Sequence, residues 1–379
     1  MIAKNLKCKE LDTLFDFLEK NRLFNGVILL SEKGQTLYKR AVGKRTNIEQ
    51  HSNDSIFEVA SISKSFTAMA VMILVEENKL KLDDDLKKFF PYFPYKNITI
   101  KNLLNHTSGL PDYMEWFEKA INWNHNKIAT NKDVVNYLGD EKPEVLFQAN
   151  ERWEYCNTGY VLLAEIIEMV SKMRFGEFLE KRIFEPLNMF NTSTYSQFLD
   201  DEIEKFSLGF IYNWAEDLYK LPNEIEEHKY VYFLDGIKGD GGIKSTVDDL
   251  SKWERAIYNN DLVSEQTKES IITPFYFNGD TSGEYCPCLH KILGGYGLGW
   301  KIEDHPRYKK IVLHDGYWAG YSSGLISYKD SERAIIMLNN FDYTDNELNK
   351  TPHLLALALE SILFGGKADL QEFEQLIYV

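Results

Sequence analysis

The chain of 379 residues contains only four cysteines, and this scarcity excludes a disulfide framework as the source of its stability. It also lacks any run of about 18 apolar residues, so no segment is expected to span a membrane. Its composition is 44% apolar and 14% aromatic. These values exclude a disordered protein and suffice for one large or two interleaved globular domains.

Positive charge is also scarce. The chain has 43 Lys and Arg residues against 58 Asp and Glu residues, which gives a formal net charge of -15. Because nucleic acids and anionic membrane surfaces attract basic proteins, this balance argues against either as the main partner. A small-molecule or peptide substrate is the partner that we expect, and the sequence leaves the oligomeric state open.

The first ten residues carry charges throughout and contain no apolar run of the length that a signal peptide needs. As written, the chain is therefore expected to stay in the cytoplasm. An extracytoplasmic location would follow if an export signal had been trimmed from the sequence.

Motifs for cofactors and metals are sparse. Walker and dinucleotide-binding spacings are absent, so we interpret Asp240-Gly241-Gly242 as a glycine turn before a helix. The segment from Cys286 to His290 places Cys286, Cys288 and His290 at alternating positions, which on a strand would share one face. A fourth ligand is not visible, and an ordinary loop or strand explains these residues equally well. We therefore expect no metal and no cofactor.

Hydrophobic periodicity indicates strands near both ends of the chain and mostly helices between them. A first amphipathic helix is expected at about 11–21, followed by a β-hairpin over 26–39. Residues 296–338 return to a strand pattern, and a last helix is expected over 354–363. We therefore predict an α+β fold in which both termini build one antiparallel sheet, flanked by terminal helices.

This pattern also predicts a division into domains. Residues 1–83 and 293–379 would form the α/β sheet domain. Residues 84–292 would form a mostly helical inserted domain, with an active site at the junction.

One buried helix stands out, starting at about Ile62. Its apolar residues recur at helical spacing and fill most of its faces, which is typical of a core helix. Ser61 and Lys64 lie three residues apart at its start, so their side chains would meet on one edge of the first turn. A serine beside a lysine is a nucleophile beside a possible base. Because both residues are common, this S-x-x-K spacing alone does not establish catalysis.

Two further motifs gain meaning from their order along the chain. Y-x-N occurs four times, but Tyr155-Cys156-Asn157 stands on a loop just before a predicted helix. H-x-G occurs once, as His314-Asp315-Gly316 at the end of a predicted strand. His106 and Ser108 share a turn, and we interpret them as loop-stabilising residues because the sequence places no carboxylate partner beside them.

In this order the motifs resemble those of the serine β-lactamase and penicillin-binding protein superfamily, in particular its class C-like branch of β-lactamases, DD-carboxypeptidases and esterases. The supporting segments are Phe57–Phe66, Leu103–Leu110, Tyr155–Tyr160, Gly241–Leu250, Tyr296–Trp300 and His314–Ser323. The resemblance implies the α+β fold of the β-lactamase/transpeptidase type and a serine hydrolase without a cofactor.

The resemblance also implies catalytic roles for three residues. Ser61 would attack a carbonyl carbon and form an acyl-enzyme, and Lys64 would assist its deprotonation. Tyr155 would share protons with both and protonate the leaving group. Whether Lys64 or Tyr155 is the principal base stays open.

Four further residues would bind the substrate on the same grounds. Asn157 would contact Lys64 and an amide of the substrate. On the neighbouring predicted strand, His314, Gly316 and Tyr317 would also contact the substrate. The backbone N–H groups of Ser61 and Tyr317 would form the oxyanion hole.

The chain departs from the resemblance at His314-Asp315-Gly316, where class C β-lactamases carry Lys-Thr-Gly. A histidine is largely neutral at pH 7, and the aspartate replaces a hydroxyl donor with negative charge. Both changes weaken the binding of a carboxylate such as that of a β-lactam, although related carboxypeptidases also carry histidine at the first position.

We therefore expect a serine hydrolase acting on esters or amides, of the esterase or D-amino-acid peptidase or carboxypeptidase type, with weak β-lactamase activity at most. The alternative is a penicillin-binding or sensor protein that is acylated without efficient turnover.

Overall fold

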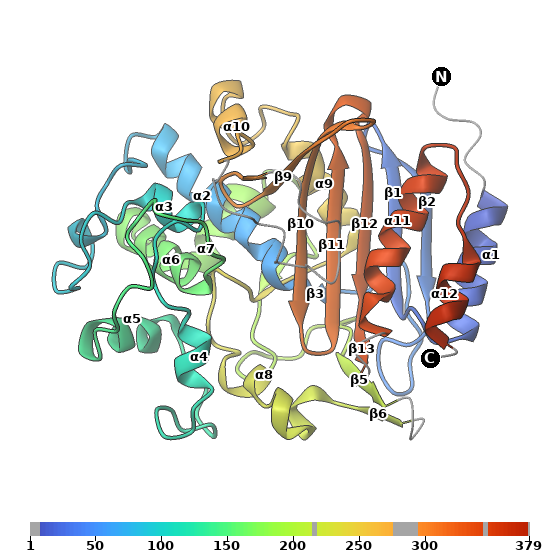
Figure 1. Ribbon diagram of the computed structural model, residues 1–379, viewed down its shortest axis with the longest axis horizontal. Helices are drawn as coiled ribbons and strands as arrows, with labels where there is room; N and C mark the ends of the chain where they lie inside the picture. The colour runs from blue at the N-terminus through green and yellow to red at the C-terminus, as the bar shows by residue number, and fades with distance from the viewer. Residues whose placement is uncertain (1–7, 214–217, 276–294, 344–347, 378–379) are drawn as a thin grey trace.

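The computed structural model describes residues 8–213, 218–275, 295–343 and 348–377, and a seven-stranded antiparallel sheet forms its centre (Figure 1). The strand order is β2-β1-β12-β11-β10-β9-β8. The strands are β1 (Gly26–Glu32), β2 (Gln35–Val42), β8 (Gly295–Tyr296), β9 (Lys301–His305), β10 (Lys309–Trp318), β11 (Tyr321–Tyr328) and β12 (Arg333–Asn339). Strands from both ends of the chain pair side by side, which confirms the predicted α+β fold.

Strand β1, which lies next to the edge strand β2, shows that both faces of this sheet are covered. Its residues from Val27 to Leu30 are fully buried, although strand side chains alternate between the two faces. Val27 and Leu29 join the apolar cluster that contains the buried helix α2 (Ser63–Glu76). Ile28 and Leu30 join a second cluster beneath the terminal helices. A strand buried on both faces becomes a continuous apolar run in the sequence.

The second cluster lies under three helices, α1 (Cys8–Lys20), α11 (Thr351–Leu363) and α12 (Leu370–Ile377), which Figure 1 shows together on one side of the sheet. The apolar residues of α1 from Leu11 to Leu18 are buried, as their helical spacing predicts. The helix expected over 354–363 begins at Thr351, and α12, which the periodicity did not reveal, follows it.

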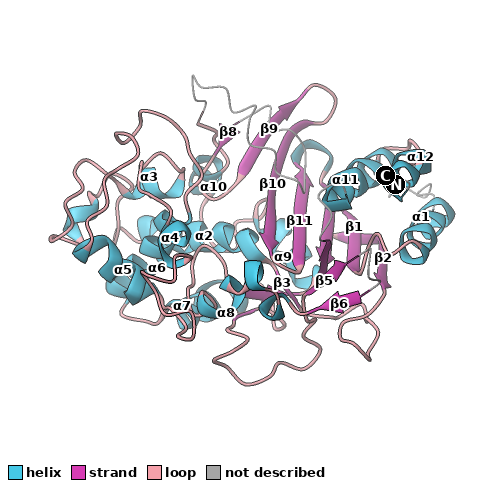
Figure 2. Cartoon of the chain, turned by 60° about the horizontal axis from the view of Figure 1, so that its bottom comes forward, coloured by secondary structure: helices cyan, strands magenta, loops and turns pink. Residues whose placement is uncertain are grey.

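The other face of the sheet packs against α2 and α9 (Val247–Ala256), and Figure 2 shows α2 between the sheet and the group of helices farthest from α1, α11 and α12. Every residue of α2 from Ser63 to Leu74 is buried, so it is the core helix that its composition predicts. Around it lie α3 (Ile100–Leu104), α4 (Tyr113–Phe117), α5 (Asn131–Asp140), α6 (Asn157–Ser171), α7 (Phe175–Leu179), α8 (Tyr230–Phe233), α9 (Val247–Ala256) and α10 (Glu265–Ile271).

Two small three-stranded sheets complete the fold. One consists of β3 (Phe57–Glu58), β7 (Ile243–Ser245) and β4 (Ser193–Thr194), and the other of β13 (Phe341–Tyr343), β5 (Phe210–Asn213) and β6 (Leu218–Lys220). Strands of two to four residues are too short to show a period of two, so the sequence did not reveal them.

The predicted division into domains stays a prediction, and its boundary at 292/293 lies outside the described residues. Across the ranges given above, no helix is long and apolar enough to cross a membrane.

The start of β1 offers a test of the sheet register. A Cβ atom on Gly26 would lie 1.9 Å from the carbonyl oxygen of Leu338 on β12. Gly26→Ala should therefore destabilise the fold by about 1–3 kcal/mol, because the two strands must move apart. Gly241→Ala is the matched control, since a Cβ atom there meets nothing within 4 Å. Equal thermal unfolding midpoints for the two variants would contradict the register.

Candidate active site

Ser61 and Lys64 are in contact at the N-terminal end of α2. The chain leaves β3 at Glu58, forms the short turn η1 (Ala60–Ile62) and enters α2 at Ser63. The Nζ atom of Lys64 donates a hydrogen bond of 3.0 Å to the Oγ atom of Ser61. Lys64 is fully buried, whereas Ser61 keeps partial access to solvent. The contact that the three-residue spacing predicts is therefore present.

The turn η1 is held by the sheets around it. Ala60 has a left-handed backbone with a φ of 47°, which is uncommon for a residue with a side chain. Its N–H donates to Glu58 Oε1 at 2.9 Å, and the Val59 carbonyl accepts from Ser323 Oγ at 2.8 Å. Glu58 also forms a buried ion pair with Lys244 of β7. These contacts tie the turn to β11 and β7.

Lys64 directs its ammonium protons at three acceptors. Besides Ser61, it donates to Asn157 Oδ1 at 2.8 Å and to the backbone carbonyl oxygen of Asp240 at 2.9 Å. Burial lowers the pKa of Lys64 to about 8, while the charges of Asp240 and Asp112 act in the opposite direction. Roughly a tenth of the lysine is therefore neutral at pH 7, and a neutral amine can accept the serine proton.

Asp112 and Asp240 are candidates that sequence reasoning missed. Asp112 accepts the Met114 N–H at 3.0 Å at the start of α4 and the Asn157 N–H at 2.7 Å. Asp240 accepts the Tyr113 hydroxyl at 2.9 Å. Each adjoins a turn that the sequence singles out, but a carboxylate beside a turn is too common to signal a site. Both nevertheless place negative charge within electrostatic reach of the buried lysine.

Tyr155 lies on the loop before α6 and faces Lys64, whose Nζ atom is 4.8 Å from the centroid of the tyrosine ring. Burial raises the pKa of Tyr155 well above its ordinary value, and a hydrogen bond with Ser61 acts in the opposite direction. The phenol therefore keeps its proton at neutral pH. The structure thus brings Ser61, Lys64, Tyr155 and Asn157 together, as the resemblance implies.

His106 supports the loop that carries Tyr155. The two rings lie 4.4 Å apart, and His106 Nδ1 accepts the Cys156 N–H at 3.1 Å. Burial lowers the pKa of His106 well below its ordinary value, so the ring is neutral. Ser108 accepts the Leu110 N–H at 3.3 Å within its own turn. These contacts agree with the interpretation of His106 and Ser108 as loop-stabilising residues, which stays a prediction.

His314 lies on β10 with both ring nitrogens in hydrogen bonds. Its Nε2 atom is 2.9 Å from the Tyr296 hydroxyl, and its Nδ1 atom is 2.6 Å from the Asp315 carbonyl oxygen. Because a carbonyl oxygen only accepts, Nδ1 carries the proton and Nε2 accepts from the tyrosine. Burial lowers the pKa of His314 to about 3. The imidazole is therefore neutral and supplies no positive charge.

The far half of β10, beyond its pairing with β9, lies against the turn that carries Ser61. A Cβ atom on Gly316 would lie 2.2 Å from the Val59 carbonyl oxygen and 2.9 Å from the Ser61 nitrogen, so this approach requires glycine. Tyr317 follows, with its hydroxyl donating to Asp342. An oxyanion hole formed by the N–H groups of Ser61 and Tyr317 stays a prediction.

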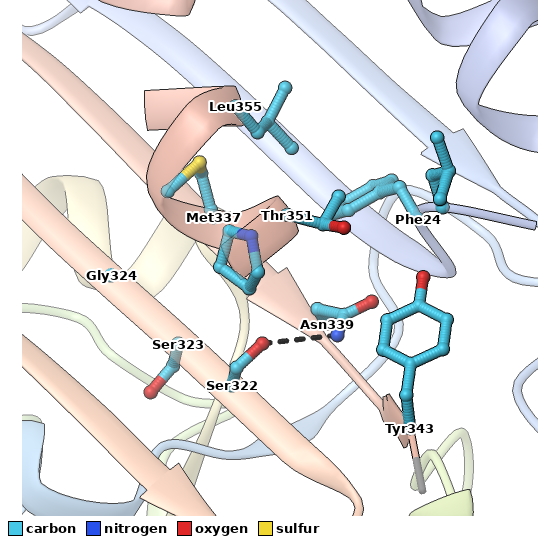
Figure 3. Close-up of a pocket in the computed structure, with 11 residues that line it drawn as sticks. Phe24, Ser322, Ser323, Gly324, Met337, Asn339, Tyr343, Thr351 and Leu355 are labelled. Carbon is cyan, nitrogen blue, oxygen red and sulfur yellow. Dashed lines mark hydrogen bonds between the residues drawn. The ribbon is translucent and has the colours of Figure 1, made fainter. Parts of the chain in front are cut away.

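A small apolar pocket on the opposite face of the sheet is separate from this cluster (Figure 3). Phe24, Met337 and Leu355 contribute to its lining, and the Asn339 side chain donates to Ser322 Oγ at 3.0 Å beside it. Because it lies between the sheet and α11 rather than next to α2, we interpret it as a packing gap.

The segment from Cys286 to His290 lies outside the described residues, so its interpretation stays open. Elsewhere, within the described ranges, no group of three or more His, Cys, Asp or Glu side chains could hold a metal ion. Cys156 lies beside Tyr155, but burial raises the pKa of its thiol to about 12, and a protonated buried thiol is unreactive.

The family model described as Beta-lactamase matches residues 12–360. The chain belongs to the β-lactamase family. Penicillin-binding protein 4* of Bacillus subtilis is 40% identical over 372 residues, which cover 97% of this chain and 79% of that protein. Protein flp of Staphylococcus aureus is 29% identical over 346 residues, which cover 88% of this chain. The match spans 63% of flp, less than two thirds of that relative.

Solved structures show the same β-lactamase-family fold. An octameric penicillin-binding protein homologue from Pyrococcus abyssi matches with a TM-score of 0.77 and 26% identity, over 95% of this chain and 78% of that one. D-amino acid amidase from Ochrobactrum anthropi matches with a TM-score of 0.71 and 22% identity, over 90% of this chain and 96% of that one. The predicted superfamily is therefore confirmed.

The buried lysine predicts a pH dependence for the reaction of Ser61. If neutral Lys64 accepts the serine proton, labelling by a fluorophosphonate should accelerate as pH rises through about 8 and level off above it. Asp240→Asn should move this transition to lower pH, because removing an anion lowers the pKa of a nearby ammonium. Asp248→Asn, which breaks the surface ion pair with Lys39, should leave it unchanged. An unmoved transition in Asp240→Asn would contradict the electrostatic assignment.

Proposed function

We propose that this protein is a serine hydrolase that acts through an acyl-enzyme on Ser61. The observation that carries the proposal is the 3.0 Å contact between Ser61 Oγ and the fully buried Lys64. A serine hydroxyl needs a base within hydrogen-bond reach, and burial gives this lysine the lowered pKa that such a base requires. Membership of the β-lactamase family supports the same chemistry.

The proposed reaction begins when Lys64 Nζ takes the Ser61 proton and Oγ bonds to the substrate carbonyl carbon. The tetrahedral intermediate expels the leaving group, which receives a proton from Tyr155, and the tyrosinate regains a proton from the Lys64 ammonium. In the second half-reaction neutral Lys64 takes a proton from the water that attacks the acyl ester, and returns it to Ser61 Oγ as the acid is released. The lowered pKa of Lys64 and the raised pKa of Tyr155 support the lysine as base and the tyrosine as proton donor.

Asn157 suits a role in substrate binding. Its Oδ1 atom accepts a hydrogen bond from Lys64, and its Nδ2 atom lies 3.6 Å from the Sδ atom of Met114. A thioether is a weak acceptor, so the amide N–H can exchange this partner for a carbonyl oxygen of the substrate. Tyr317 would add a backbone N–H to that of Ser61, and each such donor is typically worth about 3–4 kcal/mol in the transition state.

The preferred substrates would be esters or amides without a carboxylate beside the scissile carbonyl. His314 is neutral, and Asp315 adds a negative charge that pairs with Lys301 at 2.5 Å. Neither residue offers positive charge to an anionic substrate. Amides of D-amino acids fit this description, and a D-amino acid amidase shares the fold. At 22% identity, that likeness concerns the fold and not the substrate.

The second candidate is a penicillin-binding or sensor protein that is acylated without efficient turnover. The name of the relative with 40% identity, a penicillin-binding protein, favours it. The two candidates share the first half-reaction and differ in whether water releases the acyl group from Ser61.

Loss of the nucleophile provides the first test. Ser61→Ala should abolish labelling by a fluorophosphonate while leaving the thermal unfolding midpoint nearly unchanged, because the serine is partly exposed. Ser31→Ala is the control, since Ser31 is a buried serine on β1 without a hydrogen-bond partner for its hydroxyl in the described structure. Labelling that persists in Ser61→Ala would place the nucleophile elsewhere.

Substrate preference provides the second test. The wild-type chain should turn over p-nitrophenyl butyrate faster than nitrocefin, because nitrocefin carries a carboxylate and neither His314 nor Asp315 offers it positive charge. Strong nitrocefin hydrolysis without esterase activity would contradict the proposed substrate class. A label from a fluorescent penicillin that is never released would favour the second candidate.

A further inference from the structure

Ala60, the residue before the candidate nucleophile, has an uncommon backbone conformation. Its φ of 47° is left-handed, although alanine has a Cβ atom and is disfavoured there. It is buried and opens the turn η1, through which the chain passes from β3 to α2. Such a conformation persists only where the surrounding contacts impose it.

The carboxylate of Glu58 supplies one such contact. Its Oε1 atom accepts the Ala60 N–H at 2.9 Å, and the side chain is buried. A hydrogen bond to an ionised acceptor is roughly twice as strong as one between neutral groups. Because donor and acceptor belong to residues only two positions apart, this bond closes a short ring that restrains the backbone between them.

Lys244 balances the charge of this carboxylate. It lies directly opposite Glu58 in the antiparallel pairing of β3 with β7, and the two side chains form an ion pair. Lys244 is also buried, with its Nζ atom 5.6 Å and 5.5 Å from the ring centroids of Tyr195 and Phe206. A buried carboxylate stays ionised only when it has such a partner. Lys244 therefore maintains Glu58 as a charged acceptor.

The backbone at Ala60 determines where Ser61 lies. Ser61 Oγ accepts the hydrogen bond from Lys64 at 3.0 Å, and the Ser61 nitrogen lies beside Gly316 on β10. A rotation at Ala60 would move both the hydroxyl group and the N–H of Ser61 away from these neighbours. A displacement of about 1 Å in a reacting group can cost roughly 100-fold in rate.

We propose that Glu58 is a positioning residue for the reaction of Ser61. It holds Ala60 in the left-handed conformation and thereby directs the serine hydroxyl and N–H, while Lys244 keeps it ionised. Both side chains act through the backbone and not by contact with the substrate. The inference rests on the proposed Ser61 acyl-enzyme and adds two residues that belong to none of the three motifs.

The experiment compares two double variants that contain no buried charge at these positions. In Glu58→Gln/Lys244→Met, the amide oxygen of the glutamine can still accept the Ala60 N–H. In Glu58→Met/Lys244→Met, this acceptor is lost, but the side chain keeps its length. Replacing a buried ion pair by residues of similar volume is often tolerated, so both variants should fold.

Labelling of Ser61 by a fluorophosphonate is the measurement. The maximal labelling rate of Glu58→Met/Lys244→Met should be roughly 10- to 100-fold below that of Glu58→Gln/Lys244→Met, because the serine is displaced. The reagent concentration that gives half of this rate should change little, since neither side chain contacts the reagent. The thermal unfolding midpoints are measured alongside and should be similar in the two variants.

Ala60→Gly distinguishes positioning from a purely structural role. Glycine adopts positive φ values without a steric penalty. Added to Glu58→Met/Lys244→Met, it should therefore restore most of the lost labelling rate. If the ion pair only stabilised the fold, the added glycine would restore nothing, because glycine increases the entropy of the unfolded chain.

Glu32 and Arg333 provide a matched control. They also lie directly opposite each other in an antiparallel pairing, between β1 and β12, and form an ion pair of 2.9 Å. Arg333 pairs with Tyr328 at the end of β11, whereas Ser323, which contacts the turn that carries Ser61, lies near its start. Glu32→Met/Arg333→Met should therefore leave the labelling rate unchanged.

The outcomes separate this inference from the proposed function. A wild-type chain that neither turns over p-nitrophenyl butyrate nor becomes labelled on Ser61 would refute the hydrolase and the positioning role with it. Normal turnover and labelling in the wild type, with equal maximal rates in the two Glu58 double variants, would overturn the positioning role alone. A loss of rate that Ala60→Gly does not restore would overturn it as well. If Glu58→Met/Lys244→Met does not fold, Glu58→Leu/Lys244→Met replaces it under the same criteria.

Discussion

The arrangement around Ser61 depends on the burial of one ammonium group. Lys64 has no exposed surface, and a charge inside a protein is tolerated only when it has partners. Its acceptors, Ser61, Asn157 and Asp240, come from three segments that are far apart in the sequence. The three hydrogen bonds of this lysine therefore hold a hydroxyl group, a side-chain amide and a glycine turn close to one another. The same burial lowers the pKa of the lysine, so the constraint that organises the site also creates a base.

The sheet supplies a second constraint, which acts mainly through the backbone. Gly316 approaches the Val59 carbonyl so closely that any side chain would collide with it. The Ser323 hydroxyl holds the same carbonyl from β11, and the buried Glu58–Lys244 pair holds the turn from β7. A buried ion pair adds little net stability, but breaking it is costly, so it fixes geometry more than it stabilises the fold. The candidate nucleophile therefore lies on a firmly held turn at the interface between the sheet and the helices.

Features encoded in local periodicity were predictable, and features that depend on distant pairing were not. The sequence of α2 is apolar on nearly every face, and the contact between Ser61 and Lys64 follows from helical spacing. The role expected for Tyr155 came instead from resemblance, because Y-x-N carries almost no information by itself. Asp240 and Lys301 gave no signal, since their partners lie far along the chain or on a neighbouring strand. β9 lies within the strand pattern expected over 296–338, but its Lys-Ile-Glu-Asp-His sequence does not show it as a separate strand until its partners are known.

Opposing electrostatic effects decide how effective Lys64 can be as a base. Burial favours the neutral amine, while the carboxylates of Asp240 and Asp112 favour the ammonium, and the balance leaves the pKa at about 8. A lower pKa would make more of the lysine neutral at pH 7 but would weaken it as a proton acceptor, and a higher pKa would leave too little of the free base. The carboxylates that set this compromise also add negative charge around the candidate nucleophile. Together with Asp315, they add negative charge around the site, so the tuning of the base and the proposed preference for an uncharged acyl donor have a common electrostatic origin.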